Sequence, residues 1–284
     1  MVAAKAIAVQ VALVTAFLSS SQSASKPDPG IGGAKKLEFS EKPDPQKVAF
    51  RRSDADDPYL GKLRTQFELE DVVAGDESDY ARVRSICEWV RGRWEHNGDN
   101  EPKKSDPISI LEEAAGGKRF RCVEYAIVVA GALEAIGIPA RVLALKTEDV
   151  ETRPSGAGHV VAEAWLAEKK KWILIDGQFD VIPTLDGEPL NAVELQRALA
   201  AKKKGLGVDS LSGTKAENWF RWVAPYLYYF DTAFDRRHGV TRSPGALMLV
   251  PIGAKNPTVF QVKYPISNMT YTGSVPTFYA KPDA

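Results

Sequence analysis

Apolar residues recur at helical spacing in two long segments of the chain. In residues 79–94 the positions on one face are Tyr80, Val83, Cys87, Val90 and Trp94. In residues 122–136 they are Cys122, Tyr125, Ala126, Val129, Leu133 and Ile136. Side chains three and four positions apart share one face of an α-helix, so both segments are predicted to be helices packed on a core. Between them, Asp106 and Pro107 suit the N-cap and first position of a short helix.

Three runs with the character of β-strands follow the second predicted helix. They cover residues 141–146, 159–166 and 172–176. Gly137 and Pro139 end the helix before them, and the polar residues 168–170 form a turn between the last two runs. This order predicts an α+β fold in which the helix that begins at Cys122 packs on an antiparallel sheet.

The N-terminus has the three regions of a secretory signal peptide. Lys5 precedes an apolar run from Ala6 to Leu18, and a stretch of small polar residues follows it. The run is shorter than the roughly 20 residues that a membrane-spanning helix needs. We therefore expect residues 1–24 to be a signal peptide and the protein to be secreted or periplasmic, without a stable membrane span. An uncleaved anchor at the membrane interface is the alternative.

The rest of the chain is expected to form three parts. Residues 25–75 are a flexible lead-in, because proline and charge dominate their first half without apolar periodicity. Residues 76–200 are the catalytic core. Residues 201–284 are an aromatic-rich extension whose tryptophan and tyrosine side chains we expect to pack on the core rather than to line a substrate site.

Composition narrows the class of protein. With 284 residues, of which 44% are hydrophobic, the chain can bury a core without a metal or disulfide staples. Lysine plus arginine, 37 residues, equals aspartate plus glutamate, also 37, so no net charge favours a nucleic acid. The Asp54, Asp56 and Asp57 cluster lacks the glycine and the distal glutamate of a calcium loop, and is interpreted as solvated charge.

The two cysteines occupy different positions in their predicted helices. Cys87 lies within an apolar stripe, where a cysteine behaves as a small core residue. Cys122 lies at a helix start, where the helix dipole and the nearby Arg119 and Arg121 would favour a thiolate. A thiol with an ordinary pKa of about 8.5 needs such help to be a nucleophile near neutral pH. Cys122 is therefore the predicted reactive thiol.

A nucleophilic thiol also needs a histidine and a group that orients it. His159 opens one predicted strand and Asp176 ends the next. A turn of two or four residues puts both side chains on one face of an antiparallel pair, whereas a turn of three residues without a bulge separates them. With a two-residue turn at 168–169, Val161 lies opposite Asp176 and His159 is its diagonal neighbour, within side-chain reach.

Three segments resemble a known family. FRCVEYAIVVAGALEAIGIPARVLAL, GHVVAEAWL and WILIDG are similar to the signature blocks of the transglutaminase-like superfamily of papain-like cysteine enzymes, here of an exported bacterial type. The resemblance covers residues 78–180. It implies that Cys122 is the nucleophile, His159 the general base and acid, and Asp176 the orienting carboxylate. Val161 and Gly177 depart from the family pattern, since many relatives have an aromatic residue and a proline at these positions.

The resemblance implies acyl transfer through a thioester on peptide or protein amides, cell-envelope amides among them. Water as acceptor makes the enzyme an amidase or peptidase, and an amine makes it a cross-linking enzyme. No cofactor and no metal are expected, because the calcium sites of the animal enzymes have no visible counterpart. The alternative is a non-enzymatic exported binding module in which Cys87 and Cys122 form a disulfide.

Four further residues stay open at this point. His96 either lies near the substrate site or is a loop residue, and His238 has no assigned partner. Glu163 shares the face of His159 and is either a polar neighbour of the site or a surface carboxylate. The backbone N–H of Cys122 is a natural oxyanion donor, and Trp94 or a loop residue would supply the second.

Overall fold

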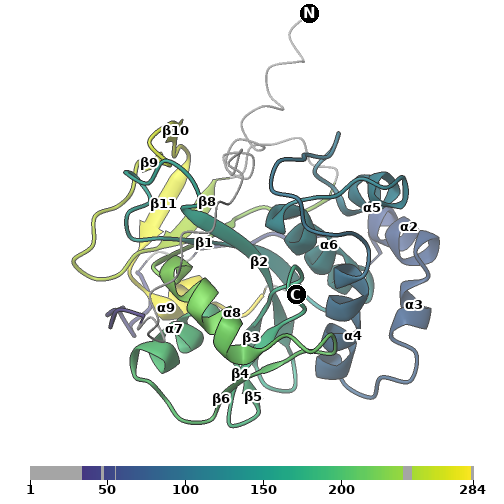
Figure 1. The fold of residues 1–284 in the computed structure, drawn as a ribbon, viewed down its shortest axis with the longest axis horizontal. Coiled ribbons are helices and arrows are strands. Elements are labelled where there is room, and N and C mark those ends of the chain that lie inside the picture. The colour runs from purple at the N-terminus through teal and green to yellow at the C-terminus, as the bar shows by residue number, and fades with distance from the viewer. Residues whose placement is uncertain (1–33, 46–47, 55, 239–244, 283–284) are drawn as a thin grey trace, which may run out of the picture.

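The computed structural model describes residues 34–45, 48–54, 56–238 and 245–282 (Figure 1). The helices are α2 Pro58–Gln66, α3 Leu69–Val72, α4 Asp79–Arg91, α5 Pro107–Ala115, α6 Cys122–Ala135, α7 Ala192–Ala200, α8 Ala216–Val223, the 3₁₀ turn η1 Ala224–Tyr226 and α9 Val275–Phe278. The strands are β1 Ala140–Lys146, β2 Gly158–Leu166, β3 Lys171–Ile175, β4 Ile182–Leu185, β5 Glu188–Pro189, β6 Leu206–Asp209, β7 Tyr229–Ala233, β8 Ala246–Leu249, β9 Val259–Phe260, β10 Tyr264–Pro265 and β11 Met269–Thr272. The predicted helices and strands of the core are confirmed to within a few residues.

A six-stranded sheet organises the molecule. Its strand order is β11-β8-β7-β1-β2-β3. The pairs from β8 to β3 are antiparallel, and only the outer pair β11–β8 is parallel. The three strands expected from the sequence therefore form one half of this sheet, and the C-terminal extension supplies the other half.

Each face of the sheet is covered by its own hydrophobic core. On one face, helices α2 to α6 pack against the alternate side chains Ala162, Ala164, Ile173 and Ile175. On the other, α7, α8 and the C-terminal Phe278 pack against Val161 and Leu174. Figure 1 shows the two groups of helices on opposite sides of the sheet. The α+β prediction, with the Cys122 helix packed on an antiparallel sheet, is confirmed.

Local signals explain where the core helices begin and end. The Asp106 side chain accepts the backbone N–H of Ser109 at 3.0 Å, and Pro107 occupies the first position of α5, as predicted. Helix α6 ends before Gly137, which has a φ of +87° that a side chain with a Cβ would disfavour. These signals determine where α5 begins and where α6 ends.

The structure differs from the flexible lead-in expected for residues 25–75. From Pro58 onward this range forms α2 and α3, and the buried side chains of Leu60, Leu63 and Leu69 belong to the core beside α6. Only Leu60 and Leu63 are buried in α2 and only Leu69 in the four-residue α3, so these helices leave too weak a periodic signal to be recognised in the sequence. The predicted signal peptide, residues 1–24, lies outside the described residues. No helix in the described ranges has both the length and the apolar character needed to cross a membrane.

Candidate active site

The N-terminus of α6 presents Cys122 at the first helical position. The preceding residue, Arg121, is the N-cap, and its backbone N–H is bound by the Glu124 side chain at 3.1 Å. The first backbone N–H groups of a helix have no partner within the helix and carry the positive end of its dipole. The half-buried Cys122 thiol and its own N–H therefore lie where negative charge is stabilised.

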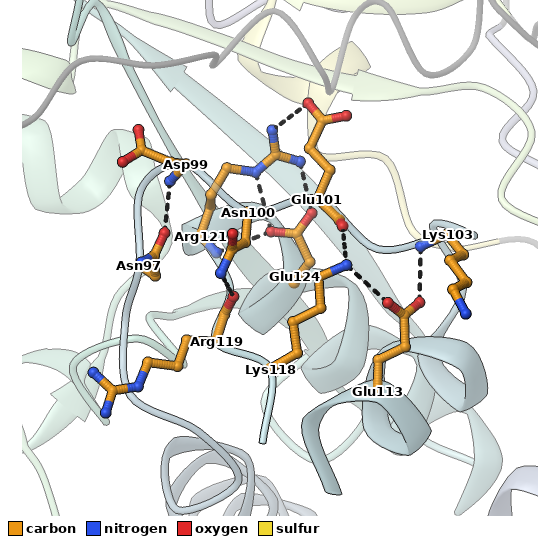
Figure 2. A network of polar contacts seen from close by, with 10 residues as sticks. All are labelled: Asn97, Asp99, Asn100, Glu101, Lys103, Glu113, Lys118, Arg119, Arg121 and Glu124. Atoms are coloured by element: carbon orange, nitrogen blue, oxygen red, sulfur yellow. Dashed lines mark hydrogen bonds and ion pairs between the residues drawn. The ribbon is translucent and has the colours of Figure 1, made fainter. Parts of the chain in front are cut away.

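The interpretation of Arg121 as a charge that stabilises the thiolate needs correction. Its guanidinium is only 3% exposed and is bound by Glu124 at 2.8 Å and by Glu101 at 2.7 Å (Figure 2). Burial lowers the pKa of Arg121, but the hydrogen bond and charge of Glu124 outweigh it and raise the pKa overall. Arg121 thus has its charge compensated by two carboxylates, and it anchors the loop of Glu101 to the start of α6. The Arg119 side chain is exposed and points away from this network.

Strands β2 and β3 bring His159 and Asp176 together. Ala162 lies opposite Ile175, so the register continues to Val161 opposite Asp176, as the two-residue turn predicted. The turn has four residues, since Leu166 pairs with Lys171, and this length preserves the same register. The His159 Nε2 and Asp176 Oδ2 atoms are 2.9 Å apart, and both residues are almost fully buried.

His159 also contacts the Cys122 side chain. Burial lowers the pKa of His159, but the charge of Asp176, its hydrogen bond, and the hydrogen bond and charge of Cys122 raise the pKa to about 10. Because Nε2 faces Asp176, Nδ1 is the ring nitrogen left for the sulfur. Cys122, His159 and Asp176 therefore form one hydrogen-bonded chain, with a histidine that holds its proton near neutral pH.

Asp176 accepts a second hydrogen bond through the same oxygen. The indole Nε1 of Trp219, on α8, lies 2.9 Å from Asp176 Oδ2. The other carboxylate oxygen, Oδ1, accepts the backbone N–H of Gln178 at 3.1 Å. Both oxygens of the buried carboxylate are thus bound, which is what the burial of a charge requires.

Cys87 is a free, buried thiol on α4, and Cys122 is free as well. The Cys87 Sγ lies 3.8 Å from the backbone oxygen of Asp176. Burial raises the pKa of Cys87 well above its ordinary value, and the charges of Asp180 and Asp176 add to this. Cys87 is therefore a core residue beneath the site, as the apolar stripe predicted, and the disulfide alternative has no support in the structure.

Aromatic side chains surround the His159 ring. Trp222 makes an edge contact with its centroid 4.5 Å from that of His159, and the centroids of Tyr226 and Phe179 lie 6.0 and 6.3 Å away. Burial raises the pKa of Tyr226, with a further contribution from the charge of Cys122. The aromatic extension thus does more than pack on the core. Its helix α8 buries Trp219 and Phe220 and also lines the site with Trp222.

A cavity of about 400 Å³ lies beside this aromatic group. It is lined by Phe179, Thr214, Lys215, Asn218, Trp219 and Trp222. Three of these side chains also contact His159 or Asp176. The sequence placed aromatic residues at helical spacing here, but their spacing did not reveal that they meet the histidine.

The remaining candidate residues occupy distinct places. Partial burial lowers the pKa of His96, and the charge of His159 lowers it further, so His96 lies within electrostatic reach of the site although much of its surface is exposed. His238 contacts Glu134 Oε2 at 3.3 Å and stacks on Tyr59, far along the chain from the site residues.

Glu163 is neither a neighbour of the site nor a surface carboxylate. It is fully buried and forms an ion pair with Arg141 at 2.6 Å. The Tyr279 hydroxyl donates a further hydrogen bond to it at 2.8 Å. Arg141 lies directly opposite Glu163 on the neighbouring strand β1, and Tyr279 comes from the C-terminal end of the chain, so neither expectation from the sequence identified this cluster.

Trp94 and Gly177 shape the site from the side of α6. The Trp94 ring lies 4.4 Å from that of Tyr125, and its buried indole nitrogen has no hydrogen-bond partner among the described residues. At Gly177, a Cβ would approach Val129 to 2.7 Å, because α6 passes close to the chain just after Asp176. The departure from the family pattern at Gly177 therefore follows from close packing.

The described residues contain no group of three or more histidine, cysteine, aspartate or glutamate side chains arranged to hold a metal ion. The site chemistry that can be derived from them is that of a thiol, an imidazole and a carboxylate.

Comparison with known proteins relates the segment that contains the site to a family. Residues 68–177 match the model of the Transglutaminase-like superfamily, and this segment contains Cys122, His159 and Asp176. The matched segment covers less than half of the 284 residues, and the similarity is to that family over this segment. No match was found among curated proteins.

Several solved structures resemble the chain distantly. A proposed cysteine protease of Cytophaga hutchinsonii is 15% identical over 56% of this chain and 52% of that chain, with a TM-score of 0.35. The periplasmic domain of TgpA from Pseudomonas aeruginosa is 20% identical over 44% of this chain and 49% of that chain, with a TM-score of 0.33. Legionella pneumophila LapG is 12% identical over 60% of this chain and 93% of that chain, also with a TM-score of 0.33. The chain spans about half the length of the first two proteins.

Proposed function

We propose that the protein is a cysteine enzyme that transfers the acyl group of peptide or protein amides through a thioester on Cys122. One observation carries the proposal. His159 is hydrogen-bonded to Asp176 at 2.9 Å and to Cys122, which opens a helix inside the segment that matches the Transglutaminase-like superfamily. A thiol in this setting can ionise while the imidazole retains the proton.

The reaction begins with attack of the Cys122 sulfur on the amide carbonyl carbon. The oxygen becomes negative and is stabilised by the N–H of Cys122 at the start of α6. The His159 proton passes to the leaving amine as the C–N bond breaks, which leaves a thioester. Neutral His159 then accepts a proton from water or an amine, which attacks the thioester and releases Cys122.

The test measures both fates of the thioester in the full chain. Wild type and Cys122→Ser would be incubated with a peptide-amide library, with and without a fluorescent primary amine. New carboxylates indicate hydrolysis and incorporated fluorophore indicates transfer. Either product in the wild type, absent in Cys122→Ser, supports the proposal. Absence of both, together with no selective alkylation of Cys122 by iodoacetamide, contradicts it.

We also propose that the protein acts outside the cytoplasm on peptide or cell-envelope amides. Support comes from the N-terminal pattern of Lys5, the apolar run and the small polar stretch. Fractionation of cells that express the full chain, with N-terminal sequencing of the product, tests this. A protein that retains residue 1 and stays in the cytoplasm contradicts it.

The non-enzymatic alternative depends on a bond between Cys87 and Cys122. Counting thiols in the denatured, non-reduced protein decides between the two. Two free thiols agree with the enzyme, and none agrees with the binding module.

A further inference from the structure

We propose that Trp219 is a positioning residue for the reaction at Cys122: its indole N–H holds the Asp176 carboxylate in the orientation that aligns His159. This inference rests on the proposed function. It is specific to the part of the chain that follows the family match, because that match ends at residue 177 and Trp219 lies in α8.

The geometry is that of a shared acceptor. Asp176 Oδ2 accepts Trp219 Nε1 at 2.9 Å and contacts His159 Nε2 at 2.9 Å. Trp219 and Asp176 are both almost completely buried, so water cannot replace the indole donor. Two donors converge on Oδ2, and the Gln178 N–H binds Oδ1. Together these hydrogen bonds fix the orientation of the carboxylate.

The position of α8 is set independently of the site. Phe220 and Val223 on the same helix are buried in the core on this face of the sheet. The helix is therefore anchored by apolar packing, and the indole N–H is presented to Asp176 from a rigid element. Trp222, three residues after Trp219 and about one helical turn away, contacts His159 directly. Helix α8 therefore contacts two residues of the site.

The indole donor of Trp219 helps to hold the Asp176 carboxylate in place. A buried carboxylate is stabilised by each hydrogen bond that it accepts. Without the indole donor, the carboxylate has one hydrogen bond fewer to fix its orientation, and His159 is held less firmly by its partner. The other titratable groups within electrostatic reach of Asp176 are Cys87 on α4, Tyr125 on α6 and His96 in the following loop.

Trp219→Phe removes the N–H and keeps most of the aromatic volume. The matched control is Trp172→Phe, because Trp172 is equally buried and donates its indole N–H to the backbone oxygen of Ala280 at 3.0 Å. Both variants lose one buried indole hydrogen bond, and both leave His96, Cys87 and Tyr125 in place. A general loss of stability would affect the two alike.

The experiment measures kcat and KM for wild type, Trp219→Phe and Trp172→Phe in the full chain. For Trp219→Phe we expect kcat to fall about tenfold with KM within about twofold. Trp172→Phe should keep the wild-type kcat and KM. Equal kcat and KM in the two variants overturn the role of Trp219, whereas an inactive wild type overturns the proposed function instead.

A second measurement covers the case in which Trp219→Phe does not fold. In wild type labelled with ¹⁵N at the indole nitrogens of its six tryptophans, the signal assigned to Trp219 should be among those that exchange slowly with solvent. That signal should shift and exchange faster in Asp176→Ala and stay unchanged in Cys122→Ser. If no indole signal responds to Asp176→Ala, the hydrogen bond does not hold in solution and the proposal is wrong.

Discussion

Helices α4 and α6 lie in the same layer, and each carries one cysteine, yet the two thiols have opposite character. Cys87 lies in the middle of α4, fully buried, with its pKa raised by burial. Cys122 lies at the first position of α6, half-buried and hydrogen-bonded to His159. The difference teaches that position along a helix, rather than the layer it belongs to, decides whether a thiol can serve as a nucleophile.

Removing the thiols one at a time gives the strongest contrast. Cys122→Ala should lower kcat/KM by at least about 10⁴-fold, because it removes the sulfur on which the proposed thioester forms. Cys87→Ala should leave kcat/KM within about twofold. The measurement is amide turnover under identical conditions, and equal losses in the two variants would break the comparison.

The second contrast between the two thiols is that Cys122 has His159 beside it. Asp176→Asn removes the charged partner of His159. The raised pKa of His159, about 10, predicts an alkaline limb near pH 10, where the imidazolium loses the proton that the leaving amine needs. Asp176→Asn removes the charge that raises this pKa, while burial still lowers it. The limb should therefore move down toward pH 6.5 or below, and kcat at pH 8 should fall about 10³-fold. A limb that does not move in a pH–rate profile contradicts the assignment.

The caps of the two helices can be compared by mutation. Glu124→Gln leaves the buried Arg121 with only Glu101 as a charged partner, and should cost about 3 kcal/mol of the free energy of unfolding. Iodoacetamide alkylation of Cys122 should slow as well, because the helix start loosens. Ser78→Ala removes the cap of α4 and should cost about 1 kcal/mol without changing alkylation. Urea unfolding and alkylation rates check both. A Glu124→Gln protein as stable as Ser78→Ala would show that the Arg121 ion pairs contribute no more to the free energy of unfolding than an ordinary helix cap.

The smallest expected effect is on stability at Cys87. Cys87→Ala leaves a small gap beneath Asp176 and should cost about 1 kcal/mol, measured by urea unfolding. A cost above about 3 kcal/mol would indicate that Cys87 supports the site and is more than a core residue.

Much of the fold could be predicted because its signals are local. The Asp106 and Pro107 pair, the apolar stripes and the Gly137 stop all act within a few residues, and the helices and strands follow them. The register of β2 and β3 was predictable only as a dependence on turn length, and the four-residue turn of the structure is one of the two lengths that put His159 and Asp176 on one face. The helices of residues 58–72 were missed because α2 buries only Leu60 and Leu63, and the four-residue α3 is too short to show a period.

The choice of Cys122 over Cys87, and of His159 and Asp176 as its partners, was determined by the sequence itself. Helix starts and strand ends depend on residues that are close together in the sequence, so they can be recognised without a structure. The tertiary structure alone decided that Trp219 binds Asp176, that Arg121 is neutralised by Glu101 and Glu124, and that Glu163 pairs with Arg141. Most of these partners are brought together by packing across the sheet or from a distant loop, and a hydrogen bond between residues far apart in the chain leaves no periodic mark on the sequence.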